Sequence, residues 1–211
     1  GTTVTYDGDE HGATGSATGV KGETLAGLDL GAKFTDVHGG TASWTFTDVT
    51  GNYNDDSGSV AITINKADAI INVSGTTVTY DGDAHGATGS ATGVKGEALA
   101  GLDLGDSFTN VPGGTANWTF TDVTGNYNDH AGTAAIVISE RSLTVTADTQ
   151  TKVYGEDDPV LTYKITSGSL VEGDAFTGSL TREEGEEIGT YAIQQGSLTL
   201  GDNYDLTFET A

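Results

Sequence analysis

The stretch Gly1-Thr-Thr-Val-Thr-Tyr-Asp-Gly-Asp9 decides the fold, because the same nine residues return at Gly75–Asp83. The match continues downstream with a constant shift of 74 residues: of the 64 aligned positions from Gly1–Ile64 and Gly75–Ile138, 12 differ and 52 are identical. Self-similarity at a fixed period is the sequence signature of repeated domains. The 211 residues are therefore organised by an internal repeat, which overrides the domain number suggested by length alone.

A third, diverged copy follows the two close ones. The same shift places Tyr80 on Tyr154, and the segment Asp202-Asn-Tyr-Asp205 echoes Gly125-Asn-Tyr-Asn128. We therefore predict three domains, which we call the first repeat (residues 1–65), the second repeat (66–139) and the third repeat (140–211). The first repeat lacks the leading strand that the segment Ala67–Val73 supplies to the second.

The apolar residues of each repeat alternate with the period of β-strands. Ala69, Ile71 and Val73 alternate before the second copy of the nine-residue stretch, and at the matching places of the third repeat so do Leu143, Val145 and Ala147. Trp118 alternates with Phe120 between glycine-rich turns. Period-two alternation favours strands with one face on a core, so we interpret the tryptophans as core residues. The segment from Leu99 to Phe108 is rich in glycine and fits either a short strand or an irregular crossover.

These patterns predict an all-β chain. For each repeat we expect an immunoglobulin-like sandwich, with a β-grasp-like arrangement as the alternative because about 74 residues is short for a sandwich of about 100. The linkers from Ile64 to Lys66 and from Ile138 to Glu140 are short, which predicts an elongated rod of consecutive domains. An unpaired sheet edge where the leading strand is missing predicts that the first repeat is the least stable.

Composition and charge exclude several partners and sites. The chain has 31 Asp and Glu against 8 Lys and Arg, so its net charge of −23 repels nucleic acids and anionic membrane surfaces. Without cysteine it has no disulfide framework and no thiolate metal site. No apolar stretch approaches the roughly 18 residues of a membrane span, so we expect no direct membrane insertion. The absence of methionine and of a signal segment suggests excision from a longer protein.

Aspartates beside turns make calcium the one metal worth considering. Oxygen ligands gathered in one loop suit Ca²⁺, although the spacing matches no EF-hand and the same residues are common in ordinary turns. His11 and His85 occupy equivalent positions, but too few ligands accompany them for zinc, and we interpret them as turn residues. We expect no other cofactor. The calcium candidates are Asp7, Asp9, Asp55, Asp81, Asp83 and Asp129.

The repeated motifs resemble a known family. Tyr-Asp-Gly-Asp at Tyr6 and Tyr80, Tyr-Gly-Glu-Asp-Asp-Pro at Tyr154, the Asn-Tyr motif and the start at Lys66-Ala67 together resemble the MBG repeats of large bacterial surface proteins. The first two repeats are similar to the YDG type and the third to the YGX type. The third departs from the others by Tyr191 in place of the tryptophan and Pro159 in place of His85.

The resemblance implies tandem arrays in secreted, adhesin-like proteins. We expect a structural stalk or spacer at the bacterial cell surface, outside the cell, whose partners are the neighbouring repeats. The alternative is an adhesive module that recognises a glycan or a host surface protein. An enzyme is not expected, because Gly15-Ser-Ala17 and its copy do not form the Gly-x-Ser-x-Gly elbow and 31 acids supply carboxylate pairs by chance.

Overall fold

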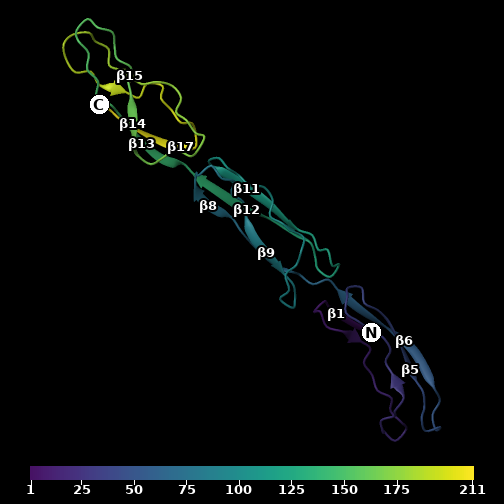
Figure 1. Ribbon diagram of the computed structural model, residues 1–211. Coiled ribbons are helices and arrows are strands. Elements are labelled where there is room, and N and C mark those ends of the chain that lie inside the picture. The colour runs from purple at the N-terminus through teal and green to yellow at the C-terminus, as the bar shows by residue number, and fades with distance from the viewer. The chain divides into compact units, whose positions relative to one another are not determined.

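The computed structural model describes all residues from Gly1 to Ala211 and contains strands and turns without helices. Its strands are drawn in Figure 1. The predicted all-β class is confirmed. There is no helix of sufficient length and apolar character to cross a membrane.

The first two repeats have matching strands. The first repeat contains β1 (Thr2–Thr5), β2 (His11–Gly12), β3 (Leu28–Asp29), β4 (Lys33–Phe34), β5 (Gly40–Phe46) and β6 (Asp56–Asn65). The second contains β7 (Ile70–Ser74), β8 (Thr76–Thr79), β9 (Thr88–Thr92), β10 (Leu102–Asp103), β11 (Gly113–Phe120) and β12 (His130–Ser139). The undecided segment after Leu99 therefore holds only the short strand β10 and a single bridge between His85 and Phe108.

The main sheet has the same order in both repeats. It runs β1-β6-β5-β3 in the first and β8-β12-β11-β10 in the second. The strand carrying the nine-residue stretch pairs in parallel with the last strand, with Thr2 opposite Ile62 and Thr76 opposite Ile136. The register of these pairs therefore follows the 74-residue shift of the sequence.

Alternation along the strands places small and large apolar side chains on one face. In β5, Ala42 and Phe46 are buried and Trp44, between them on the same face, is half-buried. Trp44 lies opposite Gly58 of β6, where an added Cβ would stand 2.8 Å from the indole. The tryptophan therefore packs over a glycine of the neighbouring strand, and part of its side chain stays exposed. The same contact recurs between Trp118 and Gly132.

The third repeat has its own arrangement. It contains β13 (Arg141–Ala147), β14 (Tyr163–Ser167), β15 (Thr181–Arg182), β16 (Ile193–Gln194) and β17 (Tyr204–Glu209). Leu143, Val145 and Ala147 are buried, as the alternation predicted. The sheet order is β14-β13-β17, and β17 pairs in parallel with β13 from Arg141 opposite Tyr204.

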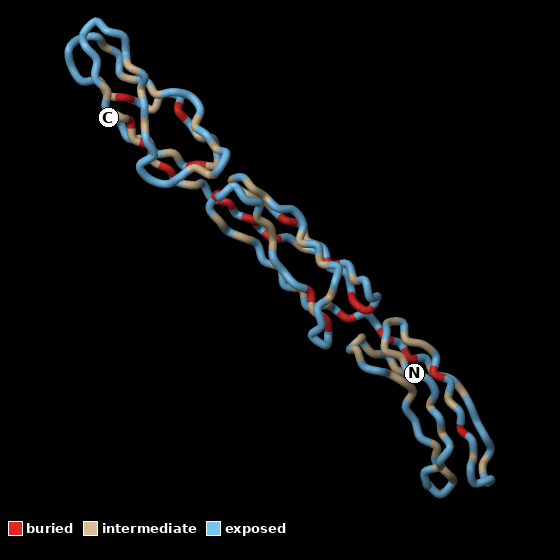
Figure 2. The backbone as a smooth tube through the Cα atoms, viewed as in Figure 1, coloured by how far each residue is buried: buried red, intermediate tan, exposed pale blue.

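Each repeat adds a two-stranded ribbon to its sheet: β2-β4, β7-β9 and β15-β16. A β-grasp requires a helix packed across its sheet, and this chain has none. The immunoglobulin-like topology stays a prediction. Figure 2 shows buried residues in short runs within largely exposed backbone. Such a limited core agrees with the small size of the repeats.

The contacts group the chain into two compact units. One comprises residues 1–73, 89–104 and 117–132, and the other residues 74–88, 105–116 and 133–211. Each unit therefore joins one terminal repeat to part of the second repeat, and the domain boundaries expected from the sequence stay a prediction. Each unit also has its own apolar cluster, around Phe120 and Tyr127 in the first and around Val145 and Tyr204 in the second.

The first repeat differs from the second at one ribbon. In the second repeat β9 pairs with the leading strand β7, whereas the equivalent residues 14–18 form no strand. We therefore expect the backbone amides of β9 that face β7 to exchange with solvent at least tenfold more slowly than their counterparts in residues 14–18. Hydrogen exchange read by NMR measures this. Equal protection of the two segments would show that the leading strand is dispensable.

Candidate functional site

Two pairs of tyrosines join residues of successive repeats. Tyr6, directly after β1, packs edge-to-face on Tyr127 with ring centroids 5.4 Å apart and an interplanar angle of 81°. Tyr80, directly after β8, packs in the same way on Tyr204 at 5.5 Å and 74°. In each pair one ring comes from the Tyr-Asp-Gly motif and the other from the Asn-Tyr motif of the following repeat. We call them the first joint (Tyr6–Tyr127) and the second joint (Tyr80–Tyr204).

An asparagine beside each second tyrosine binds the preceding repeat. Asn126 accepts a hydrogen bond from the backbone N–H of Val37 at 2.9 Å, and its Nδ2 donates to Asp36 Oδ1 at 3.0 Å. A side-chain amide suits this position because it can donate and accept at once. Asn126 is the one polar side chain in the buried class, with 6% exposed.

The second joint repeats this bonding with different residues. Asn203 Oδ1 accepts from the N–H of Val111 at 3.0 Å, and Nδ2 of Asn203 donates to Asn110 Oδ1 at 2.8 Å. The bonding pattern is therefore preserved although the outer acceptor changes from a carboxylate to an amide.

Backbone hydrogen bonds hold the linker of the first joint from both sides. The N–H of Ala67 donates to Asn126 O at 3.0 Å and the N–H of Asn128 donates to Ala67 O at 2.9 Å. On the other side, Tyr6 N–H donates to Asn65 O at 2.8 Å. The lysine between them, Lys66, reaches Tyr127 O with its Nζ at 2.8 Å. Residues 65–67 are thus held by backbone groups at the Tyr-Asp-Gly motif of the first repeat and at the Asn-Tyr motif of the second.

The hydroxyls of the buried tyrosines donate hydrogen bonds to carboxylates. Tyr127 donates to Glu97 Oε1 at 2.5 Å and accepts from the N–H of Val94 at 3.0 Å. Burial, followed by the bond to Glu97, raises the pKa of Tyr127 to about 12. At the second joint the hydroxyls of Tyr80 and Tyr204 both donate to Asp174 Oδ2, at 3.0 and 2.7 Å.

A local turn positions the Asn-Tyr motif. Asp122 accepts hydrogen bonds from the backbone N–H groups of Thr124 and Tyr127, both at 2.9 Å, and Gly125 adopts a positive φ of 86° between them. Aspartate and glycine favour such turns because one bonds nearby backbone and the other tolerates the left-handed region. The sequence Asp122-Val-Thr-Gly-Asn-Tyr127 therefore presents asparagine and tyrosine together.

The same turn in the first repeat is built on Asp48. The N–H of Tyr53 donates to Asp48 Oδ2 at 2.9 Å, and this bond is the main cause that lowers the pKa of Asp48 to about 2. Tyr53 donates to Glu23 at 2.6 Å, but its neighbour Asn52 is exposed and bonds only Thr50, at 3.3 Å.

The predicted calcium ligands do not gather at one place. Asp7 and Asp81 each accept bonds from the N–H two residues on, that of Asp9 and of Asp83, and from the nearby histidine. The carboxylates of Asp9, Asp55 and Asp129 also have protein donors: the Lys95 ammonium, Asp48 N–H and Asp122 N–H. No group of three or more His, Cys, Asp or Glu side chains is arranged to hold a metal ion, and calcium binding stays a prediction.

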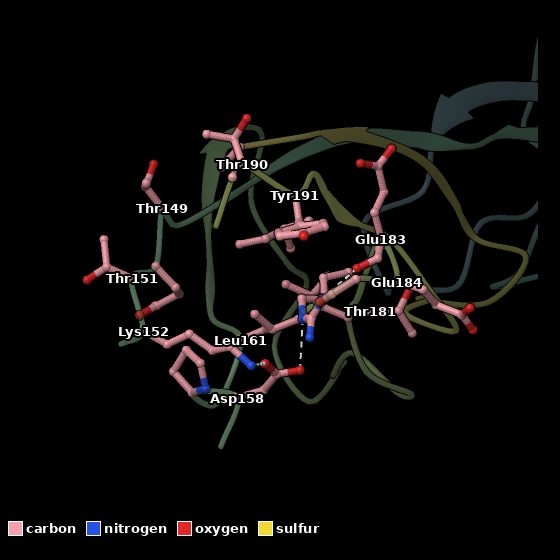
Figure 3. Close-up of a pocket in the computed structure, with 18 of the residues that line it drawn as sticks. Thr149, Thr151, Lys152, Asp158, Leu161, Thr181, Glu183, Glu184, Thr190 and Tyr191 are labelled. Carbon is pink, nitrogen blue, oxygen red and sulfur yellow. Dashed lines mark hydrogen bonds and ion pairs between the residues drawn. The ribbon is translucent and has the colours of Figure 1, made fainter. Parts of the chain in front are cut away.

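A separate pocket lies in the third repeat (Figure 3). It has a volume of about 1230 Å³. Asp158 accepts from Lys152 Nζ at 2.7 Å and from Arg182 Nε at 2.8 Å, and Arg182 lies 5.3 Å from the centroid of the Tyr191 ring. The bonds to Arg182 and then Lys152 lower the pKa of Asp158 to about 2. The two cations are thus engaged by carboxylates within the pocket.

The sequence shows the tyrosines and asparagines that form the joints, but it does not show which of them contact each other. Tyrosine and asparagine recur at fixed positions in the motifs, which marks them as important without saying that they meet across the repeat boundary. Tyr154, the third motif tyrosine, is 67% exposed and belongs to neither joint.

Comparison with known proteins supports the family resemblance for the third repeat. Residues 143–211 match the family model of the MBG domain (YGX type). The YGX-type resemblance expected for this part is confirmed, and the YDG type of the first two repeats stays a prediction. No curated protein matches the chain.

The asparagine of the first joint should contribute measurably to stability. We expect Asn126→Ala to lower the free energy of unfolding by about 1–3 kcal/mol, because it leaves the N–H of Val37 without its acceptor. The matched control Asn52→Ala removes only an exposed bond and should change stability by less than about 0.5 kcal/mol. Urea unfolding measures both, and equal effects would contradict the assigned role of Asn126.

The hydroxyl of Tyr127 should make stability depend on alkaline pH. Since its folded pKa is raised to about 12 from 10.0, its contribution is complete below about pH 10 and is lost as pH rises through 12. Tyr127→Phe should therefore reduce the loss of stability between pH 10 and 12 in urea titrations. Tyr154→Phe, outside both joints, should leave that loss unchanged. An unaltered alkaline profile in Tyr127→Phe would contradict the raised pKa of the Tyr127 hydroxyl.

Proposed function

We propose, from the MBG-domain match of residues 143–211, that the chain is a set of structural repeats serving as a stalk or spacer in a secreted or cell-surface bacterial protein. MBG domains are repeat modules of such proteins, and the proposal extends this role to all three repeats. Its location outside the cell is part of the same proposal.

The observation that carries the proposal is the recurrence of one joint. Both linkers are flanked by an edge-to-face tyrosine pair and by an asparagine bonded to the preceding repeat. Bending at such a linker would separate the packed rings and break the hydrogen bonds of the asparagine, and both changes cost free energy. A spacer needs this property, because it must keep its ends apart.

The repeated polar residues support a mechanical role over a catalytic one. Asn126 bonds Asp36 of the preceding repeat, and Tyr127 bonds Glu97. At the second joint Tyr204 bonds Asp174 in the same way. We therefore include the absence of enzymatic activity in the proposal. Neighbouring repeats are the proposed partners.

A binding role is the second candidate, and the pocket of the third repeat favours it. Its wall combines an aromatic ring at Tyr191 with the polar groups of Lys152, Asp158 and Arg182, the kind of surface that sugars contact. Screening the chain on a glycan array would test it. Binding that Tyr191→Ala abolishes would favour the adhesive module.

Solution scattering tests the spacer. A compact globule of this length has a radius of gyration of about 17 Å, whereas a rod of three consecutive domains on the order of 100 Å long, from strands rising about 3.3 Å per residue, should exceed about 25 Å. We expect the larger value. The variant Tyr127→Ala with Asn126→Ala should broaden the distribution of dimensions, and Tyr53→Ala with Asn52→Ala is its matched control. A value near 17 Å would overturn the proposal.

A further inference from the structure

The first repeat carries a second copy of the surface that forms the first joint. Five residues of the second repeat contribute to that joint: Val94, Lys95, Glu97, Asn126 and Tyr127. Their counterparts 74 residues earlier are identical in type. We call them the first-repeat face: Val20, Lys21, Glu23, Asn52 and Tyr53.

The two surfaces are also built alike. Tyr53 donates to Glu23 Oε1 at 2.6 Å, as Tyr127 does to Glu97 at 2.5 Å. The N–H of Val20 donates to the Tyr53 hydroxyl at 3.2 Å. Internal bonds thus hold Tyr53 in the orientation that Tyr127 has in the joint.

The surfaces differ in what lies against them. Tyr127 is 1% exposed under Tyr6, whereas Tyr53 is only half-buried. Asn126 bonds Val37 and Asp36, whereas Asn52 is exposed. The first-repeat face therefore presents an aromatic ring and an amide with the geometry of a joint.

Charge indicates which kind of repeat suits this face. In the first joint Lys95 forms an ion pair with Asp9 of the Tyr-Asp-Gly-Asp motif, with Nζ and Oδ1 2.8 Å apart. The first-repeat face has Lys21 at the equivalent position. In the third repeat Val171 donates its N–H to the Tyr204 hydroxyl as Val94 does to that of Tyr127, so Glu172 takes the place of Lys95. A lysine favours an acidic turn by charge complementarity, and a glutamate opposes one. The face therefore matches the first joint and not the second.

We propose that the first-repeat face binds the Tyr-Asp-Gly-Asp turn of a further repeat of the kind seen in the first two. The tyrosine of that turn packs on Tyr53, a backbone N–H of the partner donates to Asn52 Oδ1, and the second aspartate of the turn pairs with Lys21. The inference rests on the proposed role of the joints, and it adds the chemistry of a third contact.

An extended chain tests the inference. Residues 1–74 are placed directly before Gly1, which reproduces the spacing between Tyr6 and Tyr127. The added copy carries Tyr53→Phe, so that the peptide holding the original Tyr53 has its own mass, and nitration of each tyrosine by tetranitromethane is followed by peptide mass spectrometry. We expect nitration of Tyr53 to slow by about tenfold relative to the original chain, since burial limits access of the reagent. Tyr154, at 67% exposure, should react equally in both chains and serves as the internal reference.

Variants of the added copy identify the contact. Tyr6→Ala in the added copy should restore the original nitration rate of Tyr53, and Asp9→Lys in the added copy should restore part of it. Combining this Asp9→Lys with Lys21→Asp in the original copy should slow the nitration of Tyr53 again. Apart from Tyr53→Phe, the added copy has the sequence of residues 1–74, which are folded in the original chain. Its folding is checked by the increase in tryptophan fluorescence that its Trp44 adds to the signal of the original chain.

Two results would overturn the inference. One is an unchanged nitration rate of Tyr53 in the extended chain; if scattering still gave an extended particle, the spacer proposal would survive that failure. The other is concentration-dependent protection of Tyr53 in the original chain that Tyr154→Ala abolishes. That result would assign the face to the third-repeat turn of a second copy.

Discussion

The arrangement of this chain depends on one side-chain amide at each repeat boundary. Asn126 satisfies the N–H of Val37 and donates to Asp36, so a backbone group of one repeat has its hydrogen-bond partner in the next. A buried donor without an acceptor is costly, which makes such a bond directional as well as stabilising. The neighbouring tyrosine pair adds an aromatic contact between the same two repeats. Small domains with little core of their own gain stability from such neighbours.

The hierarchy of the structure follows from this constraint. An aspartate-based turn fixes the Asn-Tyr motif, the fixed motif bonds the linker, and the linker begins the next strand. The tyrosine hydroxyls add a polar end to each joint, with Glu97 in one and Asp174 in the other. Because Asp174 accepts from both tyrosines and Glu97 is bonded by Tyr127, the two joints share a plan and differ in detail.

Much of the fold could be predicted from the sequence, because period-two alternation is a local signal. The burial of Leu143 and Val145 followed from it directly. The contact between Trp44 and Gly58 did not, because the two residues belong to different strands. The joints could not be predicted either, since the sequence shows that Tyr6 and Tyr127 recur but not that they meet. The aspartates considered for calcium illustrate the same limit: turn chemistry and metal chemistry use the same residues, and only the partners of each carboxylate distinguish them.

The most direct test of this account is a double-mutant cycle across the second joint, with Tyr80→Ala, Tyr204→Ala and the double variant compared by urea unfolding. If the two rings and their shared Asp174 bind the repeats together, the coupling free energy should be about 0.5–1.5 kcal/mol or more. Additive effects, with a coupling free energy of zero, would show that the tyrosines stabilise their own repeats separately and that the joint does not connect them.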